Sequence, residues 1–324
     1  MKKTFFLLVA AAAVFAGCQK NTITDYSTEN GLADASTGRQ CASQEVYEQQ
    51  VKLDPSRAQR MQEIEDFTQT AIREHAGRLV NGVIEIPVVV NVLYRTTAQN
   101  VSLTQINSQI AVLNADFGAT NTDYNNTPSI FQSLRSGNTN IRFVLSQVIR
   151  KSTTKTSWST NDAMKKSSQG GLNPTTPTTH LNIWVCNLSN GILGYAQFPG
   201  GSSATDGVVI DDNAFGTTGT ATAPFNKGRT ATHEVGHWAN LRHIWGDATC
   251  GSDLVNDTPL HNTANYGCPA AGHRSTCTGT PVEMTMNYMD YTDDACMYMF
   301  SLGQKARMQA VFAVGGPRNS FAQP

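Results

Sequence analysis

Residues 233–247, HEVGHWANLRHIWGD, contain three of the chain's 7 histidines and carry the strongest prediction of fold and chemistry. His233 and His237 are four residues apart, so on an α-helix their side chains project from one face. This spacing lets two imidazole nitrogens reach one Zn²⁺ ion at about 2.0–2.1 Å. Glu234 follows the first histidine and faces the same space, where its carboxylate can take a proton from water without binding the metal. The stretch predicts a helix that carries a zinc site.

The third histidine of the stretch requires a break in the helix. His243 lies six residues after His237, and a continuous helix would turn its side chain about 120° away from the other two. The chain must therefore reverse near residue 240. Such a reversal commonly ends a helix with a residue at positive φ, where glycine is easiest and asparagine is the best-tolerated alternative. Asn240 fits this position, so the sequence predicts that the three imidazoles converge on one metal ion.

Two other interpretations of the histidines compete with a catalytic site. Three histidines on a buried helix can be core residues with satisfied hydrogen bonds. A structural zinc site is the second alternative, but such sites are usually closed by four protein ligands, often cysteines. Three histidines leave one coordination position open for water, as in catalytic zinc sites. The sequence therefore favours a hydrolytic site with Glu234 as the general base.

A second motif lies downstream, in NYMDYTDDACMYMF at residues 287–300. With HEVGHWANLRHIWGD, NYMDY and four flanking cysteines, residues 80–315 resemble the metzincin metalloproteases. They are most similar to the pappalysin family and its ulilysin-like and cytophagalysin-like bacterial members. The long metzincin motif is HExxHxxGxxH, and this chain has Asn240 at the glycine position. The resemblance implies a zinc endopeptidase that acts on proteins or peptides.

The expected fold class is α/β (α+β), because strand-like and helix-like segments precede a loop-rich C-terminal part. The resemblance implies a metzincin-type catalytic domain. In such a domain a twisted mixed sheet and an active-site helix lie above an irregular, disulfide-stapled C-terminal subdomain. We expect the catalytic domain at 61–324, with an N-terminal subdomain to about 240 and a C-terminal subdomain at 241–324.

Periodicity and caps predict the individual elements. Helices are expected at 56–75, from Ser102 to Phe117 with a Ser102–Gln105 capping box, at 230–240, and from Ser301 with Gln304 three residues on. Strands are expected at 83–96, 141–149, 181–188 and 206–212. Pro87 favours an edge or strand-start position for the first strand. The last strand, DGVVIDD, is expected to pair with an extended substrate or to be an ordinary sheet edge.

The resemblance also assigns roles to residues after the histidines. Met289 would be the methionine of the Met-turn beneath the zinc site, although core packing alone also explains it. Tyr291 would donate its hydroxyl to the oxyanion of the tetrahedral intermediate, and the alternative is a plain aromatic core residue. Family members cleave before basic residues, notably arginine. Asp293 and Asp294 are therefore candidates for acidic groups of the S1′ pocket, or else surface carboxylates after a turn.

The loop GSDLVNDTPLH at residues 251–261 is a candidate calcium site. Asp253, Asp257 and Thr258 offer the oxygen ligands that Ca²⁺ prefers, and the family binds calcium near this loop. A solvated acidic loop explains the same residues equally well, because their spacing is not that of an EF-hand. The expected metal ions are therefore zinc and calcium.

Four cysteines near the C-terminus predict disulfides. Cys250, Cys268, Cys277 and Cys296 form an even cluster, which in an exported chain indicates two bridges with three possible pairings. The resemblance implies the pairs Cys250–Cys277 and Cys268–Cys296. Cys186 lies in the apolar run LNIWVCNL and is expected to be a buried free thiol.

The first residues predict export. A basic start, a short apolar run and small residues precede Cys18, as in a signal peptide over 1–17. Residues 15–18, FAGC, resemble a lipobox, which implies a lipid on Cys18 and a lipid-anchored polar tether at 18–40. Simple secretion without lipid is the alternative. The chain is thus expected at the cell envelope or outside the cell, touching a membrane only through this lipid.

Cys41, in RQCASQEVYEQQ, suggests how activity is held back. A thiolate is a good zinc ligand and can fill the open coordination position. Propeptides of related proteases use such a cysteine switch, commonly with glycine after the cysteine, where this chain has Ala42. Residues 41–60 are therefore expected to be a propeptide, with autolysis before Arg57 or Arg60. A lone tether cysteine without a role is the alternative.

The combined prediction is a secreted or lipid-anchored zinc endopeptidase, made as a zymogen, with a preference for Arg or Lys at P1′. The alternative from another class is a surface-anchored, metal-loaded binding protein or adhesin without activity. A different zinc hydrolase, such as an amidase, is the third interpretation. The net charge of −1 gives no electrostatic footprint for nucleic acid, and the sequence leaves the oligomeric state open.

Overall fold

The structure is a computed structural model, and it describes residues 38–74 and 82–322. The predicted signal peptide (1–17), the lipid site Cys18 and most of the predicted tether lie outside these residues. None of the described helices combines the length and the apolar character needed to cross a membrane.

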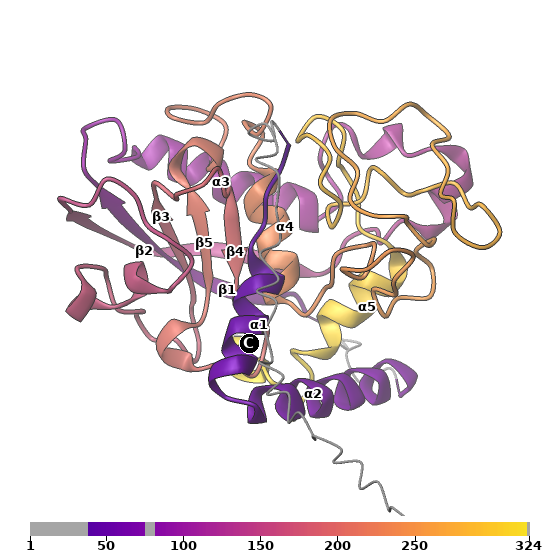
Figure 1. Cartoon of the computed structure of the whole chain (residues 1–324), viewed down its shortest axis with the longest axis horizontal. Helices are drawn as coiled ribbons and strands as arrows, with labels where there is room; N and C mark the ends of the chain where they lie inside the picture. Colours follow the sequence, from indigo (N-terminus) through magenta and orange to yellow (C-terminus); the bar gives the residue numbers. More distant parts are fainter. Residues whose placement is uncertain (1–37, 75–81, 323–324) are drawn as a thin grey trace, which may run out of the picture. The chain divides into compact units, whose positions relative to one another are not determined.

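Five strands form one mixed sheet in the order β2-β1-β3-β5-β4. Four of them run parallel: β1 (Ile84–Tyr94), β2 (Ile141–Ser152), β3 (Leu181–Cys186) and β5 (Val208–Asp211). The short strand β4 (Gly194–Ala196) runs antiparallel to β5 at one edge. Figure 1 shows this sheet twisting from β2 to β4. The predicted α/β class with a mixed sheet is confirmed.

One expectation about strand positions is wrong, and another holds only for the first part of a strand. Strand β1 as a whole lies inside the sheet, between β2 and β3, and not at an edge. Its pairing with β3 begins only at Val88, so Pro87 stands in a stretch with one neighbouring strand, where a missing N–H is tolerated. Strand β5 is not an edge either, because β4 covers its outer side. The sequence did not predict β4, since three residues are too few to show a period.

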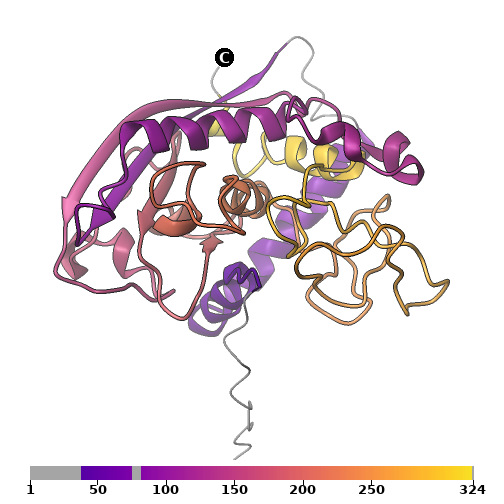
Figure 2. The same ribbon diagram turned by 90° about the horizontal axis from the view of Figure 1, so that it is seen from above.

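Two helices pack on one face of the sheet. Helix α3 (Leu103–Phe117) contacts β2, helix α4 (Arg229–Trp238) contacts β4 and β5, and the two helices contact each other (Figure 2). Ser102 caps α3 by accepting a hydrogen bond from Gln105 N. The Gln105 side chain, however, donates to Phe215 O and to Thr220 Oγ1. The predicted capping box at α3 is therefore only half formed, because a tertiary contact takes the glutamine.

The remaining helices lie at the two ends of the chain. Helix α1 (Ser43–Leu53) contacts β4 and α2 (Ser56–Arg73), and α2 contacts α5 (Leu302–Ala310). Ser301 and Gln304 form a complete capping box at the start of α5. The sequence pattern did not predict α1, because only Ser43 and Val46 of this helix are buried. Val46 belongs to the smaller apolar core that contains Trp184 and Tyr195, whereas the buried apolar residues of α4 belong to the larger core.

The chain between α4 and α5 is largely irregular and lies beside α4 (Figure 1). Two disulfides, Cys250–Cys277 and Cys268–Cys296, tie it together in the pairing that the resemblance implies. Cys186 is buried and free, as expected. Short 3₁₀ helices of the described chain are Tyr124–Asn126, Ser129–Leu134, Ala163–Lys165, Ser167–Gln169, Ser203–Thr205, Asp212–Ala214 and Asn319–Phe321.

Candidate active site

Helix α4 carries two of the three histidines, and the turn after it returns the third. Asn240 has a φ of +75°, in the left-handed region. Its N–H donates to His237 O, and Leu241 N donates to Gly236 O, each over 2.9 Å. These two bonds make a Schellman motif, which ends the helix and reverses the chain. As a result His243 Nε2 lies 3.0 Å from His237 Nε2, so the reversal predicted at residue 240 is present.

The hydrogen bonds of the three rings test whether a metal fits between them. In each ring the Nδ1 atom faces an oxygen. For His233 this is Tyr288 O at 2.7 Å, and for His237 it is Leu241 O at 2.8 Å. For His243 it is the carboxylate oxygen Asp247 Oδ1 at 2.5 Å. These oxygens only accept, so Nδ1 carries the proton and the Nε2 lone pairs face one another. Unprotonated nitrogens 3.0–3.1 Å apart repel unless a cation lies among them. The donor set therefore fits zinc, with each ring oriented by an outer acceptor.

A cysteine completes the cluster of potential ligands. Cys41 Sγ and one nitrogen each of His233, His237 and His243 all lie within 4.8 Å of one another, and all four residues are buried. Among the described residues this is the one such group of three or more His, Cys, Asp or Glu side chains. Burial, together with the neighbouring rings, lowers the pKa of His233 and His237. The His233 and His237 rings are therefore neutral, as metal ligands must be.

The segment that carries Cys41 extends the sheet at β4. Leu193 N donates to Gln40 O over 2.9 Å, and Ala42 N donates to Gly194 O over 3.1 Å. Cys41 and Gly194 form a parallel bridge. These backbone bonds hold the thiol at the histidines, although Cys41 is about 190 residues distant in sequence. Burial, and then the Glu234 carboxylate, raise the pKa of this thiol.

Glu234 points into the same space from α4. Its Oε2 atom accepts hydrogen bonds from Ser43 Oγ at 2.8 Å and from Cys41 Sγ at 3.3 Å. Burial raises the pKa of this carboxyl to about 7. A Cβ atom at Gly194 would lie 3.0 Å from Glu234 Cγ, so glycine in β4 lets the carboxylate approach the edge of the sheet. Glu234 is thus covered by the N-terminal segment and does not bind solvent freely.

Two residues of the NYMDY motif border the cluster. Tyr291 donates its hydroxyl to Cys41 O over 3.0 Å, and its ring lies 5.0 Å from the His243 ring. Burial raises the pKa of Tyr291, so the hydroxyl remains a proton donor. Met289 packs against α4, where a Cβ atom at Gly236 would lie 2.6 Å from its sulfur. The motif therefore supplies a hydroxyl at the site and an apolar support beneath the helix.

Comparison with known proteins identifies this arrangement. Residues 174–313 match the peptidase M43 family, described as pregnancy-associated plasma protein-A. An extracellular metalloprotease of Verticillium alfalfae is 32% identical over 241 residues, which cover 70% of this chain and 78% of that protein. The chain belongs to the M43 family of metallopeptidases. An extracellular metalloprotease of Pyricularia oryzae is 42% identical over 140 residues, 41% of this chain and 48% of that protein.

Solved structures agree with this assignment to the M43 family. A mutant of promirolysin from Tannerella forsythia has a TM-score of 0.80 and 44% identity, over 88% of this chain and 97% of that chain. Mature mirolysin from the same organism, in complex with a cleaved peptide, has a TM-score of 0.72 and 47% identity, over 75% and 96%. This M43 peptidase is therefore a zinc-dependent peptidase with the predicted metzincin fold.

The two candidate specificity residues lie in different surroundings. Asp294 is buried and accepts from Arg39 Nη2 over 2.6 Å, while its second oxygen accepts from Lys227 N over 2.7 Å. Arg39 is also buried and donates to Thr230 Oγ1 over 2.8 Å. Asp293, the other candidate, is partly exposed. Asp294 of this M43 peptidase thus forms a buried ion pair with an arginine of the N-terminal segment, and the space that the Arg39 guanidinium fills is called the Asp294 pocket. The sequence did not single out Arg39, because nothing local links it to Asp294.

The loop predicted to bind calcium is held by internal hydrogen bonds. Both Asp253 oxygens accept from Thr258 Oγ1 at 2.9 Å. Asp257 is directed toward the start of α5, where it accepts from Ser301 Oγ at 2.7 Å and from Gly303 N at 2.8 Å. These contacts account for the carboxylates without a cation, so calcium stays a prediction.

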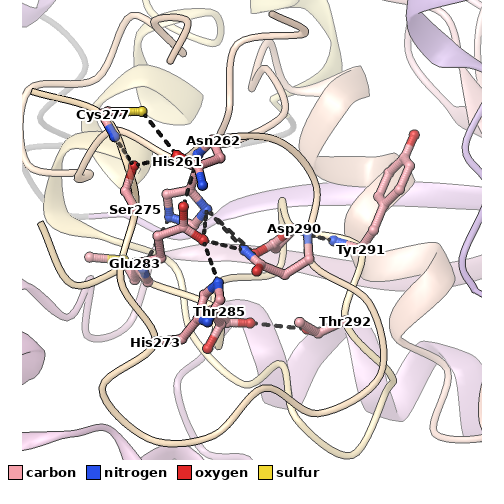
Figure 3. Close-up of polar contacts among 12 residues, drawn as sticks. His261, Asn262, His273, Ser275, Cys277, Glu283, Thr285, Asp290, Tyr291 and Thr292 are labelled. Carbon is pink, nitrogen blue, oxygen red and sulfur yellow. Dashed lines mark hydrogen bonds and ion pairs between the residues drawn. The ribbon is translucent and has the colours of Figure 1, made fainter. Parts of the chain in front are cut away.

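A buried polar network behind Tyr291 was not predicted (Figure 3). Asp290 Oδ1 accepts from Tyr291 N and from Asn265 N, each over 2.8 Å. The Asn265 amide bridges Asp290 Oδ2 at 2.9 Å and Glu283 Oε2 at 2.7 Å, and His261 lies against both carboxylates. Burial raises the pKa of Asp290 to about 7. The network ties the loop that carries Tyr291 to the disulfide-stapled loops, and the sequence gives no periodic signal for it.

Proposed function

We propose that this M43 peptidase is an endopeptidase in which His233, His237 and His243 hold zinc and Glu234 is the general base. Zinc, when bound, supplies the Lewis acidity that activates water and polarises the scissile carbonyl. The observation that carries this proposal is the convergence of three Nε2 lone pairs at 3.0–3.1 Å beside a buried carboxylate. Three imidazole ligands and a carboxylate that does not bind the metal are typical of a hydrolytic metal site with one coordination position available for water.

The roles of the other residues follow from their contacts. Glu234 takes the proton of the attacking water and delivers it to the leaving amine. The hydrogen bonds that it accepts from Ser43 and Cys41 support this role, because its carboxylate already accepts hydrogens from a segment that lies beside the histidines. Tyr291 donates to the oxygen of the scissile carbonyl, as it donates to Cys41 O. Met289 supports α4 from below and does not bind metal.

The N-terminal segment keeps the enzyme latent. Cys41 lies in the cluster, Ser43 engages Glu234 and Arg39 fills the pocket at Asp294. Because Arg39 also contacts the catalytic domain, at Asp294, the inhibitory segment begins before residue 41. The similarity to promirolysin over 88% of this chain, and to mature mirolysin over 75%, supports a removable segment ahead of a catalytic domain at about 61–324. Autolysis before Arg57 or Arg60 would release it.

Substrate preference follows from the acidic pocket. Asp294 is fully buried and pairs with a guanidinium in the latent chain, so the mature enzyme takes Arg or Lys at P1′. Asp293 precedes Asp294 in the chain, is partly exposed and adds long-range attraction only. Export is supported by the names of the curated relatives, which are extracellular metalloproteases. The lipid at Cys18 and the calcium site complete the proposal and rest on the sequence.

One experiment tests the proposed function. The purified full chain is assayed for zinc and for cleavage of a peptide library, before and after its own maturation, with and without a chelator. We expect about one zinc per chain, cleavage before Arg and Lys, and loss of cleavage in chelator that zinc restores. A chain that holds zinc but cleaves no peptide would instead be the metal-loaded binding protein of the alternative.

A further inference from the structure

An arginine beside the metal cluster has a buried side-chain N–H without an acceptor. Arg242 stands between the turn at Asn240 and His243, and its Nε atom is buried without a hydrogen-bond acceptor. No carboxylate among the described residues pairs with it. Glu65 and Asp247 act on its charge from a distance, but Glu65 pairs with Arg307 and Asp247 accepts from His243 Nδ1. Burial, together with Arg307, lowers the pKa of Arg242. A half-buried guanidinium without an anionic partner lowers the folding stability. We therefore expect an anionic group from a bound molecule to complete this site.

What covers Arg242 comes from the segment proposed to be removed. The Tyr47 ring of α1 lies 5.9 Å from its guanidinium carbon, and the Phe198 ring lies 5.3 Å away. Tyr47 and Phe198 meet edge to face, with ring centroids 6.0 Å apart. Phe198 in turn packs on His237, 5.3 Å away. The arginine and the phenylalanine therefore form a wall beside the cluster, and Tyr47 covers this wall only while α1 is present.

The direction of the N-terminal segment tells which side of the cleft this wall borders. Arg39 lies in the Asp294 pocket, Cys41 lies at the histidines, and the chain then continues into α1. A substrate with its P1′ arginine in the Asp294 pocket has its scissile bond at the cluster. Its residues N-terminal to that bond must extend to the other side of the cluster, which is the side of α1, Tyr47 and Arg242.

We infer that Arg242 and Phe198 form a subsite for an acidic side chain N-terminal to the scissile bond, masked by Tyr47 in the latent chain. The inference rests on the proposed endopeptidase function and on loss of α1. The guanidinium offers donors in a fork that matches a carboxylate, and Phe198 offers an apolar wall for the methylene groups. Because no carboxylate among the described residues pairs with Arg242, an acidic occupant fits better than a neutral one.

The test uses the full chain after its own maturation, with loss of α1 checked by N-terminal sequencing. Peptides carry a fixed P1′ arginine, and Glu, Gln or Lys in turn at each of the four positions before the scissile bond. At one of these positions we expect the peptide with Glu to have a kcat/KM about tenfold higher than the peptide with Lys. The difference should come mainly from a lower KM for the Glu peptide. Arg242→Gln should abolish this ratio and Arg242→Glu should invert it, an inversion that a purely structural arginine would not produce. Arg142→Gln, on the far edge strand β2, is the matched control and should keep the ratio.

A salt series on the unmodified enzyme guards against variants that do not fold. The preference for Glu over Lys should shrink as ionic strength rises, because salt screens the pair. Equal cleavage of Glu and Lys peptides at every position, or a preference that salt and Arg242→Glu leave unchanged, overturns the subsite while the protease function stands. A chain that cleaves none of the peptides refutes the proposed function and the subsite with it.

Discussion

Helix α4 with its turn and the segment around Cys41 meet at the same point, but they reach it by different routes. The histidines are placed by local geometry, one helical spacing and one reversal at Asn240. Cys41 and Arg39 are placed by contacts with residues about 190 and 255 positions away. The catalytic centre is therefore built into a short stretch, whereas its inhibition is a property of the assembled fold, and variants in the two regions should have separable effects.

The largest effect is expected at Glu234, which belongs to the local part. Glu234→Ala removes the general base and should lower kcat/KM on a P1′-arginine peptide by ~10²–10⁴, with zinc content unchanged. The variant should also stay unprocessed when the unmodified chain matures. Glu63→Ala, an exposed residue of α2, is the control. Peptidase activity close to that of the unmodified chain would refute the assignment of the base.

The next effect concerns the pocket that the N-terminal segment fills. Asp294→Asn keeps the shape of the side chain but removes the negative charge that pairs with a bound arginine. The preference for Arg over Ala at P1′ should fall by roughly 30-fold or more, measured as a ratio of kcat/KM values. Asp293→Asn is the matched control and should change this ratio far less. Equal losses in both variants would mean that the two carboxylates share the role.

The inhibitory segment itself is tested at Cys41. Cys41→Ala removes the thiol from the cluster, so the full chain should mature and hydrolyse peptide sooner, by roughly tenfold in initial rate if ~1.4 kcal/mol of inhibition is lost. The readout is the lag before processing and before peptide hydrolysis. Cys186→Ala, the other buried free thiol, should keep the lag of the unmodified chain. An unchanged lag in Cys41→Ala would leave Arg39 and Ser43 as the inhibitory contacts.

The smallest effect is expected at the turn that joins the histidines. Asn240→Val places a β-branched residue at a φ of +75°, which should cost about 1–2 kcal/mol of folding stability and weaken zinc binding. Asn240→Gly should preserve both, since glycine adopts this conformation freely. Thermal unfolding with and without zinc measures the change. A valine variant as stable as the glycine variant would show that the turn tolerates another backbone conformation.

The regular elements could be anticipated where periodicity or a cap was strong. Strands β1, β2 and β3 and helices α2, α3, α4 and α5 lie where the pattern of apolar residues indicates them. Short or mostly exposed elements could not be anticipated. Strand β4 has three residues, and α1 buries only Ser43 and Val46, so neither has a period that a sequence can display. The order of the strands could not be predicted either. Strands β1 and β5 are buried on both faces, so their apolar pattern is the same whether the strand lies at an edge of the sheet or inside it.

Local geometry could be derived from the residues alone. HEVGHWANLRH specifies which side chains share a helix face and where the backbone must reverse, because both follow from helical spacing and from the φ values that asparagine tolerates. Contacts between distant segments depend on the folded chain. Arg39 on Asp294, Ser43 on Glu234 and Tyr47 over Arg242 are pairings between segments that only folding brings together, and no local spacing encodes them.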